Sequence, residues 1–290
     1  APPPLCVPAV SWRPLQRETI HLSKTPEARR ICFVNGTRFW GGGEKWHFDT
    51  AVYLSGQGHR VWCAAHPKGV LYRRLASTAV RRYPLALTNG SFLNPVKIWR
   101  LALFFRAHRI QVVVFNGSVE MKAAAVAARV SGVPARVYRR GLAVAVKAGA
   151  LNRLMFRRMV THFLASSRLT AETLFQHLPR PTRPGSVEII YNGVDLSRFS
   201  PRAEHRAEAE GRRPLVLGTA GRLVEQKGHV YLIDMAARLK AEKLPFRLLI
   251  AGDGPLAPVL RHEIQAREVE KEVALIGFVK DTASFLRSLD

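Results

Sequence analysis

The chain of 290 residues is long enough for two medium-sized domains. Its apolar fraction of 47% and its aromatic fraction of 9% exclude a disordered chain. The charge is unusual, because 45 Lys and Arg stand against 21 Asp and Glu, a net charge of +24. Residues 1–200 hold 30 basic and 8 acidic side chains, whereas residues 201–290 hold 15 and 13. The first part is therefore expected to meet an anionic partner: nucleic acid, an anionic membrane surface or a phosphorylated acceptor.

The three cysteines, Cys6, Cys32 and Cys63, are scattered, with no CxxC pair and no His at ligand spacing. We expect reduced thiols in a cytosolic protein, and neither a zinc site nor a disulfide framework. No apolar run approaches the roughly 20 residues that span a bilayer. Residues 1–30 are rich in Pro and Arg and lack an apolar core segment, so they are predicted to be a disordered extension and not a signal peptide.

A strand, a glycine-rich turn, a helix and a second strand follow this extension. The strand is predicted at residues 31–35, the turn at Gly36–Gly43, the helix at residues 46–57 and the next strand at residues 60–65. This order is typical of the start of a doubly wound parallel sheet. The glycines fit neither the dinucleotide-binding fingerprint nor a P-loop, so a simple tight turn and a ligand-binding turn both stay open.

The alternation of helices and strands continues to residue 191. Helices are predicted at residues 97–109, 121–130, 147–162 and 169–177, and strands at residues 111–115, 135–138, 163–166 and 188–191. The helix at 97–109 mixes large apolar residues with Arg and is open to two interpretations, a packed crossover helix or a membrane-surface helix. The basic residues of the helix at 147–162 have two interpretations: they form an ordinary solvated face, or they contact an anion.

A charged stretch without apolar periodicity, residues 202–213, is the predicted linker. After it, a strand at residues 214–217 leads through Gly218–Gly228 into a helix at residues 229–240. Arg222 and Lys227 lie within this turn, beside a helix N-terminus that already favours anions. An anionic ligand would explain both cations, and a solvated basic loop is the alternative. Strands at residues 246–251 and 273–276 and helices at residues 256–266 and 282–289 complete the pattern.

Four segments together resemble one enzyme family. They are Gly41-Gly42-Gly43-Glu44, then Ile189–Asp195 with Phe199 and Pro201, then Gly221–Gly228, and last Ala251–Pro255 followed by Gly277–Val279. In this order and at these separations they make residues 31–290 similar to the retaining GT-B glycosyltransferases of the family-4 type. The resemblance implies an α/β fold of two Rossmann-like domains with parallel sheets, the second incomplete. Residues 31–201 would form the acceptor-side domain, and residues 214–290 part of the nucleotide-sugar-binding domain.

The resemblance also implies a site. Arg222 and Lys227 would be the catalytic cations that hold the diphosphate of the donor. Donor-binding glycines would be Gly41, Gly42 and Gly43 from the opposite domain, together with Gly221, Gly252 and Gly254. Fixed cations stabilise the charge that develops on the leaving phosphate, so no metal and no cofactor is expected beside the nucleotide-sugar substrate. In such retaining enzymes the donor phosphate itself helps to deprotonate the acceptor.

The chain departs from the family pattern in two places. Many relatives have a His after the strand at residues 135–138, where this chain has Arg139-Arg140-Gly141. Arg cannot act as a base, so Arg140 is either a phosphate or acceptor contact or a surface residue. Glu44 and Asn192 are further candidates for such contacts. The family's paired Glu segment does not occur before Asp290, so we expect a truncated chain with weak or no catalysis.

The sequence thus predicts a retaining, metal-independent glycosyltransferase that acts on a lipid-linked or lipopolysaccharide-type acceptor. We expect it in the cytoplasm, peripherally at the inner face of the membrane, with a nucleotide sugar and an anionic acceptor as partners and no nucleic acid. The alternatives are a non-catalytic GT-B module, a relative of the sugar-nucleotide epimerases, and a basic nucleic-acid-binding protein. Against the last, no helix-turn-helix, RNP or zinc-finger signature occurs.

Overall fold

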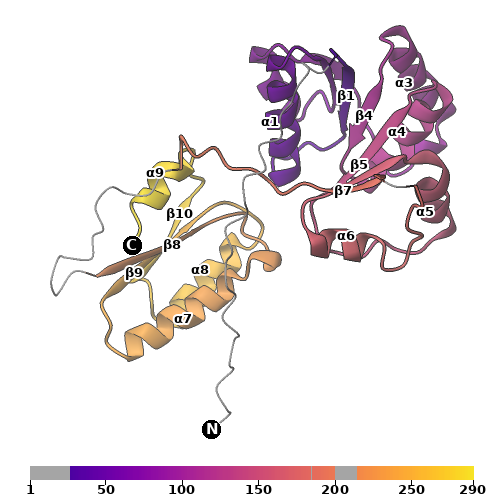
Figure 1. The fold of residues 1–290 in the computed structure, drawn as a ribbon. Coiled ribbons are helices and arrows are strands. Elements are labelled where there is room, and N and C mark those ends of the chain that lie inside the picture. Colours follow the sequence, from indigo (N-terminus) through magenta and orange to yellow (C-terminus); the bar gives the residue numbers. More distant parts are fainter. Residues whose placement is uncertain (1–26, 184, 200–213) are drawn as a thin grey trace, which may run out of the picture. The chain divides into compact units, whose positions relative to one another are not determined.

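The computed structural model describes residues 27–183, 185–199 and 214–290. The chain divides into two units, Ala1–Asn192 and Gly193–Asp290, each with its own parallel sheet (Figure 1). The predicted extension at residues 1–30 lies mostly outside the described residues, and the predicted linker at residues 202–213 lies wholly outside them. The domain boundaries drawn from the sequence therefore stay predictions.

The first unit alternates strands and helices. Its strands are β1 (Arg30–Asn35), β2 (Arg60–Ala65), β3 (Arg81–Pro84), β4 (Val112–Phe115), β5 (Ala135–Arg140), β6 (His162–Ala165) and β7 (Val187–Ile189). Its helices are α1 (Gly42–Gly56), α2 (Val70–Arg74), α3 (Pro95–Ala107), α4 (Ser118–Val130), α5 (Ala150–Leu154) and α6 (Arg168–Leu174). Short 3₁₀ turns lie at Leu75–Ser77 and Ser91–Leu93, and a π-helical turn follows α5 at Met155–Met159.

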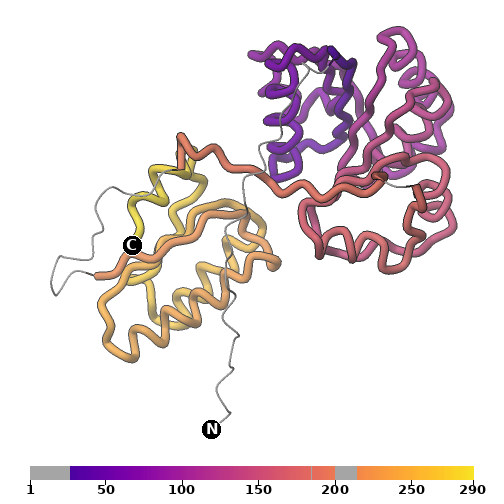
Figure 2. Tube along the Cα trace, viewed as in Figure 1, coloured from indigo at the N-terminus to yellow at the C-terminus, as the bar shows by residue number. Residues whose placement is uncertain are grey.

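The seven strands pair in parallel in the order β3-β2-β1-β4-β5-β6-β7. The chain therefore builds one half of the sheet outward from β1 and then returns to β1 with β4. Figure 2 shows this return, with the indigo β1 beside the magenta segment that contains β4. Helices cover both faces, as a parallel sheet requires.

Alternation along β1 assigns the two faces of the sheet. Cys32 and Val34 pack into a core with α3 and α4, whereas Ile31 and Phe33 pack into a second core with α1 and α2. All four side chains are buried, which is why the strand reads as a continuous apolar run. The Cys32 thiol is free, and burial raises its pKa to about 12. The thiol is therefore protonated near neutral pH and unreactive.

The predicted helix at residues 147–162 is wrong in its length. The α-helix α5 spans only Ala150–Leu154, the π-helical turn follows it, and β6 begins at His162. The reason is tertiary, because the backbone from His162 onward pairs with β5, where His162 lies opposite Val137. A local helical pattern cannot show that the end of the segment pairs with a neighbouring strand.

Other elements also differ from the sequence prediction, among them α2, which was not predicted, and the strand predicted at residues 214–217, which extends to Ala220. Strand β3 was not predicted, since Arg81–Pro84 carries two Arg and a Pro and lies at the edge of the sheet, where no apolar pattern is needed. Helix α1 begins at Gly42 instead of residue 46. Gly42 and Gly43 are therefore the first residues of a helix and not part of a turn, and Gly41 is the N-cap.

The second unit is smaller. Its elements are β8 (Leu215–Ala220), a 3₁₀ turn at Glu225–Lys227, α7 (His229–Ala241), β9 (Phe246–Ala251), α8 (Ala257–Ala266), β10 (Val273–Gly277) and α9 (Thr282–Arg287). Its strands pair in parallel in the order β10-β9-β8. The core of this unit joins α7 and α8 to the sheet through Ile233, Leu248 and Leu260, each at most 1% exposed.

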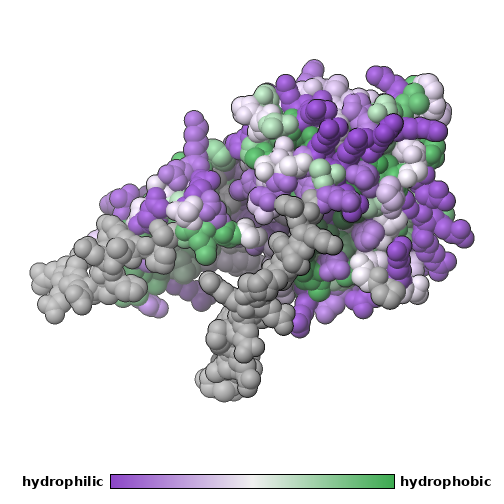
Figure 3. All heavy atoms as spheres, turned by 45° about the horizontal axis from the view of Figure 1, so that its top comes forward, coloured by the Kyte–Doolittle hydropathy of each residue, from purple (hydrophilic) through white to green (hydrophobic). Residues whose placement is uncertain are grey.

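Hydrophilic side chains project from much of the surface of the first unit, with apolar patches between them (Figure 3). This matches the basic composition of the first part of the chain. In the described parts of both units, none of the helices has the length and apolar character needed to cross a bilayer.

Candidate functional site

The basic loop of the second unit, Gly221–Gly228, connects the carboxyl end of β8 to the N-terminus of α7. Leu223 is 2% exposed and packs into the core of the unit, whereas the adjacent Arg222 is exposed. Burial of Leu223 therefore anchors the middle of the loop and keeps Arg222 at the surface. The burial of one leucine contributes about 1.5–3 kcal/mol.

The turn after β9 holds this loop through backbone contacts. Gly221 N–H donates to the carbonyl of Ala251 at 2.9 Å, and Leu223 N–H donates to that of Asp253 at 3.0 Å. A Cβ on Gly252 would lie 1.8 Å from the Gly221 carbonyl oxygen, and one on Gly254 would lie 2.5 Å from that of Leu223. The two glycines are thus required by the close approach of backbone to backbone.

The loop presents positive charge at the start of α7. The stem of Lys227 lies over Gly221, with its Cε 3.7 Å from the position of a Cβ there. Gly228 takes a left-handed conformation, φ 63°, and turns the chain into the helix. The first turn of α7 exposes backbone N–H groups and the positive end of the helix dipole. Lys227 and Arg222 add two cations to it, so the arrangement can bind a phosphate or diphosphate.

The first residue of α7, His229, is 2% exposed, and its Nδ1 has no hydrogen-bond partner among the described residues. Burial, and then the charge of Lys227, lower the pKa of its imidazole. The ring is therefore uncharged near neutral pH. The sequence analysis did not select this residue, because a single His at the start of a helix carries no distinctive pattern.

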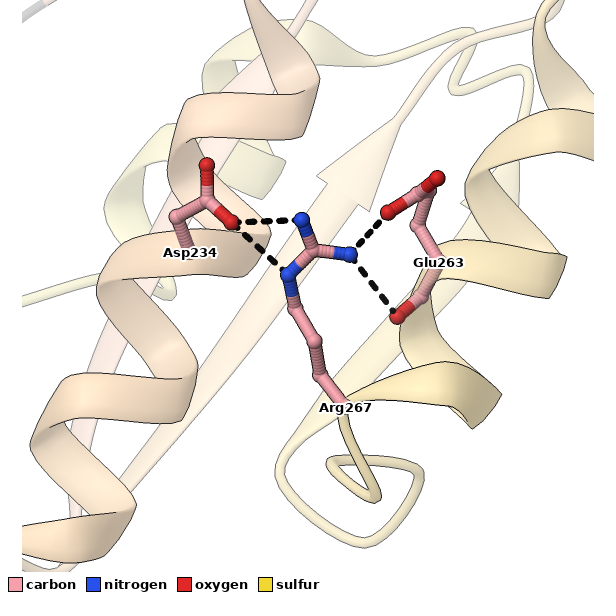
Figure 4. Close-up of polar contacts among 3 residues, drawn as sticks. All are labelled: Asp234, Glu263 and Arg267. Atoms are coloured by element: carbon pink, nitrogen blue, oxygen red, sulfur yellow. Dashed lines mark hydrogen bonds and ion pairs between the residues drawn. The ribbon is translucent and has the colours of Figure 1, made fainter.

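Ion pairs centred on Arg267 hold α7 against α8. Arg267, which follows α8, donates from Nε to Asp234 Oδ1 on α7 at 2.7 Å, and its Nη1 donates to the Glu263 carboxylate on α8 (Figure 4). These contacts raise the pKa of the guanidinium, first through the hydrogen bond to Glu263 and then through that to Asp234. One side chain thus links α7 to α8 and helps to fix the helix that follows the basic loop.

In the first unit, polar side chains gather where the order of the strands reverses. Strands β1 and β4 are neighbours, but the chain leaves them toward opposite edges of the sheet, and ligands of such sheets bind outside the carboxyl ends at this point. Asn35 ends β1 and Asn116 follows β4. Asn116 Nδ2 donates to the carbonyl of Gly43 at 3.1 Å and so ties β4 to the first turn of α1.

The glutamate of the Gly-Gly-Gly-Glu segment belongs to this cluster. Glu44 Oε1 accepts from Asn35 Nδ2 at 3.2 Å and from Thr37 Oγ1 at 2.9 Å. Its position in the first turn of α1 also favours a negative charge. A Cβ on Gly43 would lie 3.3 Å from Asn116 Nδ2, whereas one on Gly42 would meet nothing within 4 Å. Close packing against the β4 segment explains Gly43, and the space at Gly42 is open.

Of the two arginines after Tyr138, it is Arg139 that joins the cluster. Its side chain is 6% exposed, its guanidinium carbon lies 4.7 Å from the centre of the Trp46 ring, and its Nη2 donates to Asn192 Oδ1 at 3.1 Å. Burial lowers the pKa of Arg139, and the charge of Glu44 opposes this shift. A Cβ on Gly141 would lie 2.5 Å from Arg139 Nη1, so the glycine leaves room for the guanidinium.

Arg140, which the sequence suggested as the contact, lies differently. Side chains alternate along β5, and Arg140 shares the side of Tyr138. Its Nη2 donates to the carbonyl of Val144 at 3.0 Å, and its Nε is buried without a partner among the described residues. The structure brings Asn192 together with Arg139, and it does not place Arg140 beside them. A ligand role for Arg140 stays a prediction.

His47 on α1 is the most buried titratable group of the cluster. It is fully buried, its Nδ1 lies 3.4 Å from Asn35 Nδ2, and its Nε2 has no hydrogen-bond partner among the described residues. Burial and then the charge of Arg139 lower its pKa to about 3. The ring is therefore neutral near pH 7. Its position three residues after Glu44, on the inward face of α1, was the signal that the sequence analysis overlooked.

The described residues thus contain two groups of candidate ligand-binding side chains, one in each unit. Glu44, Asn192 and the start of α1 belong to the first group, and Arg222, Lys227 and the glycines Gly221, Gly252 and Gly254 to the second. The prediction that the two groups face one donor stays a prediction. No group of three or more His, Cys, Asp or Glu in the described ranges has a geometry that could hold a metal ion.

Comparison with known families gives two consecutive matches. The family described as Glycosyltransferase Family 4 matches residues 40–198, and the family described as Glycosyl transferases group 1 matches residues 201–290. The first match covers more than half of the chain. The boundary between the two matches falls close to the division between the two units.

Curated relatives carry the same assignment over parts of the chain. EpsF of Bacillus subtilis, named as a glycosyltransferase, is 30% identical over 182 residues, which are 57% of this chain and 46% of the relative. The UDP-Gal:alpha-D-GlcNAc-diphosphoundecaprenol alpha-1,3-galactosyltransferase of Escherichia coli is 29% identical over 115 residues, 37% of this chain and 30% of the relative. The chain matches less than half the length of these two relatives.

Solved structures share the fold at low identity. A glycosyltransferase from Rickettsia africae superposes with a TM-score of 0.71 at 15% identity, covering 91% of this chain and 72% of that one. Alr3699/HepE of Anabaena, in complex with UDP, superposes with a TM-score of 0.70 at 16% identity, covering 90% and 72%.

The glycine contact after β9 gives a first test. Gly252→Ala should lower the free energy of unfolding of the second unit by about 2 kcal/mol or more, because the new Cβ overlaps the Gly221 carbonyl oxygen. Gly277→Ala is the matched control: its φ is also positive, at 71°, but nothing lies within 4 Å of its Cβ. Only backbone strain of about 1–2 kcal/mol is expected there. Urea denaturation of both variants measures the difference, and equal losses would contradict the contact.

The buried imidazole of His47 gives a second test. Between its unfolded pKa of about 6.5 and its folded pKa of about 3, the unfolded chain binds one more proton than the folded chain. The stability due to the neutral ring is therefore complete above about pH 6.5 and is lost as the pH falls toward 3, by up to about 1.4 kcal/mol per pH unit. His47→Gln should flatten this slope in denaturation series from pH 7 to 4.5. His177→Gln, at an exposed site, should not, and an unchanged slope in His47→Gln would refute the assignment.

Proposed function

The chain belongs to the glycosyltransferases of family 4, with a group 1 glycosyl transferase region directly after it, and on this premise we propose that it moves a sugar from a nucleoside-diphosphate sugar to a lipid-linked or lipopolysaccharide-type acceptor. The predicted family and the predicted α/β fold of the GT-B type are confirmed. The observation that carries the proposed activity is the basic loop, held by Gly252 and Gly254 at the N-terminus of α7.

The donor in this proposal is a nucleotide sugar. Arg222 and Lys227 carry the only positive charges within the basic loop, and the first turn of α7 adds backbone N–H donors. This combination suits a diphosphate better than a single carboxylate, since two cations and a helix N-terminus can each meet a phosphate oxygen. HepE of Anabaena, a structure of the same fold, is in complex with UDP, which supports a nucleoside diphosphate as the bound group.

The proposed chemistry follows from the leaving group. As the bond between the sugar and the diphosphate breaks, negative charge grows on the phosphate oxygen, and Arg222, Lys227 and the helix dipole stabilise it. A phosphate oxygen of the donor takes the proton of the acceptor hydroxyl on the same face of the sugar, and the new glycosidic bond forms on that face. The configuration at the anomeric carbon is thereby retained, with no enzymic nucleophile and no metal ion.

The acceptor in this proposal meets the cluster of the first unit. Arg139, His47 and Glu44 offer a guanidinium, a neutral imidazole and a carboxylate around the carboxyl ends of β1 and β5. The guanidinium makes one hydrogen bond, to Asn192, among the described residues, so it retains donors for an anionic group such as the phosphate of a lipid-linked acceptor. The galactosyltransferase of Escherichia coli, a partial relative, is named for a diphosphoundecaprenol-linked acceptor, which supports this class.

Loss of either loop cation tests the donor site. Arg222→Ala and Lys227→Ala should each weaken the binding of UDP or GDP about tenfold or more, because each removes a charge-assisted hydrogen bond of about 1.5–3 kcal/mol. Arg238→Ala removes an exposed cation at the other end of α7 and should leave the affinity unchanged. Isothermal titration calorimetry with the whole chain measures the three dissociation constants. Equal binding by all three variants and the unaltered protein would refute the assignment of the loop as the donor site.

The stereochemistry of transfer tests the mechanism. With a nucleotide-sugar donor and a diphosphate-lipid acceptor, the product formed first should have the anomeric configuration of the donor, and excess EDTA should not slow its formation. Proton NMR of the product reads the configuration directly. An inverted product or loss of turnover on chelation would contradict the mechanism, and tight donor binding without any transfer would favour a non-catalytic GT-B module.

A further inference from the structure

Helix α3 is apolar on the side that faces the solvent. Its inward side packs into the core through residues that are all buried: Leu101, Ala102, Phe104 and Phe105. On the outward side Val96 is 62% exposed, Trp99 63% and Leu103 43%, and Leu93 in the preceding turn is 74% exposed. Each of the other described helices exposes at most one large apolar residue, such as Tyr53 on α1 or Val130 on α4.

The exposed residues form a stripe and not a scatter. At about 100° per residue, Val96, Trp99 and Leu103 fall within an arc of about 60°. Arg100 and Arg106, both exposed, fall on opposite sides of this arc. We call these five residues, together with Leu93, the outer face of α3. An apolar centre with cations along both margins is the pattern of a helix that lies in the interface of a bilayer.

The charge around this face is of one sign. Between Asp49 and Glu172 the sequence holds 20 Lys and Arg and a single carboxylate, Glu120. Glu120 is 5% exposed, and its Oε1 accepts from the backbone N–H of Gly36 at 2.8 Å. The surface formed by this long stretch therefore offers cations without exposed carboxylates, and it attracts an anionic surface.

The apolar stripe decides which anionic surface fits. A nucleic-acid backbone is bound mainly by cations. Nucleic-acid binding would therefore not explain why a tryptophan, a valine and a leucine are exposed together on this helix. A lipid bilayer takes up aliphatic side chains below its headgroups, and tryptophan is enriched at that level. Side chains such as Arg100 and Arg106 meet anionic headgroups at the margins while the apolar centre enters the interface.

We infer that the outer face of α3 docks the protein on an anionic phospholipid membrane. The inference rests on the proposed function only in that a lipid-linked acceptor supplies the reason for such docking. The surface belongs to the first unit alone and is built from residues that play no part in the two groups of candidate ligand-binding side chains. Its loss can therefore be separated from the loss of donor binding.

Co-sedimentation with vesicles tests the docking. The whole chain should bind vesicles of phosphatidylglycerol and phosphatidylethanolamine at physiological salt at least about tenfold more strongly than vesicles of phosphatidylcholine. Trp99→Ser combined with Leu103→Ser should weaken that binding at least about fivefold, because both apolar anchors are lost. Val259→Ser combined with Leu286→Ser is the matched control, since these residues are 46% and 45% exposed on helices of the second unit. Arg100→Gln combined with Arg106→Gln should weaken binding and reduce its dependence on salt.

Titration of each variant with UDP separates the two proposals. All variants should bind UDP as the unaltered protein does, so a loss of vesicle binding with intact UDP binding assigns the effect to α3. If the Trp99 and Leu103 variant sediments with vesicles as well as its control does, the inference fails while the proposed function stands. The inference also fails if that variant loses affinity for duplex DNA as strongly as for vesicles, since the face would then be a general anion surface. Absence of UDP binding with intact vesicle binding would overturn the proposed function and leave the docking surface.

Discussion

The backbone of the basic loop can lie against the end of β9 only because two residues there lack side chains. A Cβ at Gly252 or Gly254 would overlap carbonyl oxygens of Gly221 and Leu223. With those contacts made, Leu223 is buried and Arg222 has to face outward. The cations then lie beside a helix N-terminus, whose dipole disfavours them by about 0.3–1 kcal/mol each. An anion between them reverses the sign of that interaction, which is the physical reason for the donor site proposed here.

The first unit also contains an arrangement that costs free energy, because it buries polar groups. His47 Nε2 and Asn116 Oδ1 are buried without hydrogen-bond partners among the described residues, and an unmet buried polar group costs about 1–3 kcal/mol. Arg139 is buried against the Trp46 ring and, among the described residues, makes one hydrogen bond, to Asn192; Glu44 lies near enough to affect its pKa. Such a cluster does not contribute to stability as an apolar core would. Its position at the reversal of strand order agrees with a ligand-binding role.

The two units differ in net charge as well as in proposed role. Residues 201–290 are nearly neutral and contain the basic loop, where two cations act locally. The first part carries almost all of the excess positive charge, together with the polar cluster and the outer face of α3. A lipid-linked acceptor requires both a site for its headgroup and a surface that meets the bilayer. The basic charge of the first unit, which no single contact explains, fits both requirements.

The sequence alone determined most of the order of strands and helices, the parallel α/β fold and the basic loop, because these follow from local periodicity and from glycines next to strands. It missed α2 and the edge strand β3. It could not decide which arginine of the pair after Tyr138 enters the cluster. Side chains alternate between the two faces of a strand, and the sequence does not show which face Arg139 or Arg140 occupies. The face was set by packing of Arg139 against Trp46 of α1. The sequence also placed the end of the helix at 147–162 too late, because pairing with β5 is a tertiary event.

The case of α3 shows the same division most clearly. Its sequence is apolar nearly all round, so periodicity left a packed helix and a membrane-surface helix as alternatives. The structure shows a packed inner side and an exposed outer face. The packed crossover helix is thereby confirmed, and membrane contact through the outer face is the proposal made above. The buried state of His47 was equally invisible in the sequence, which records which side chains are apolar or charged. Only the tertiary structure decides which of them face each other and which face the solvent, because burial depends on neighbours that are distant along the chain.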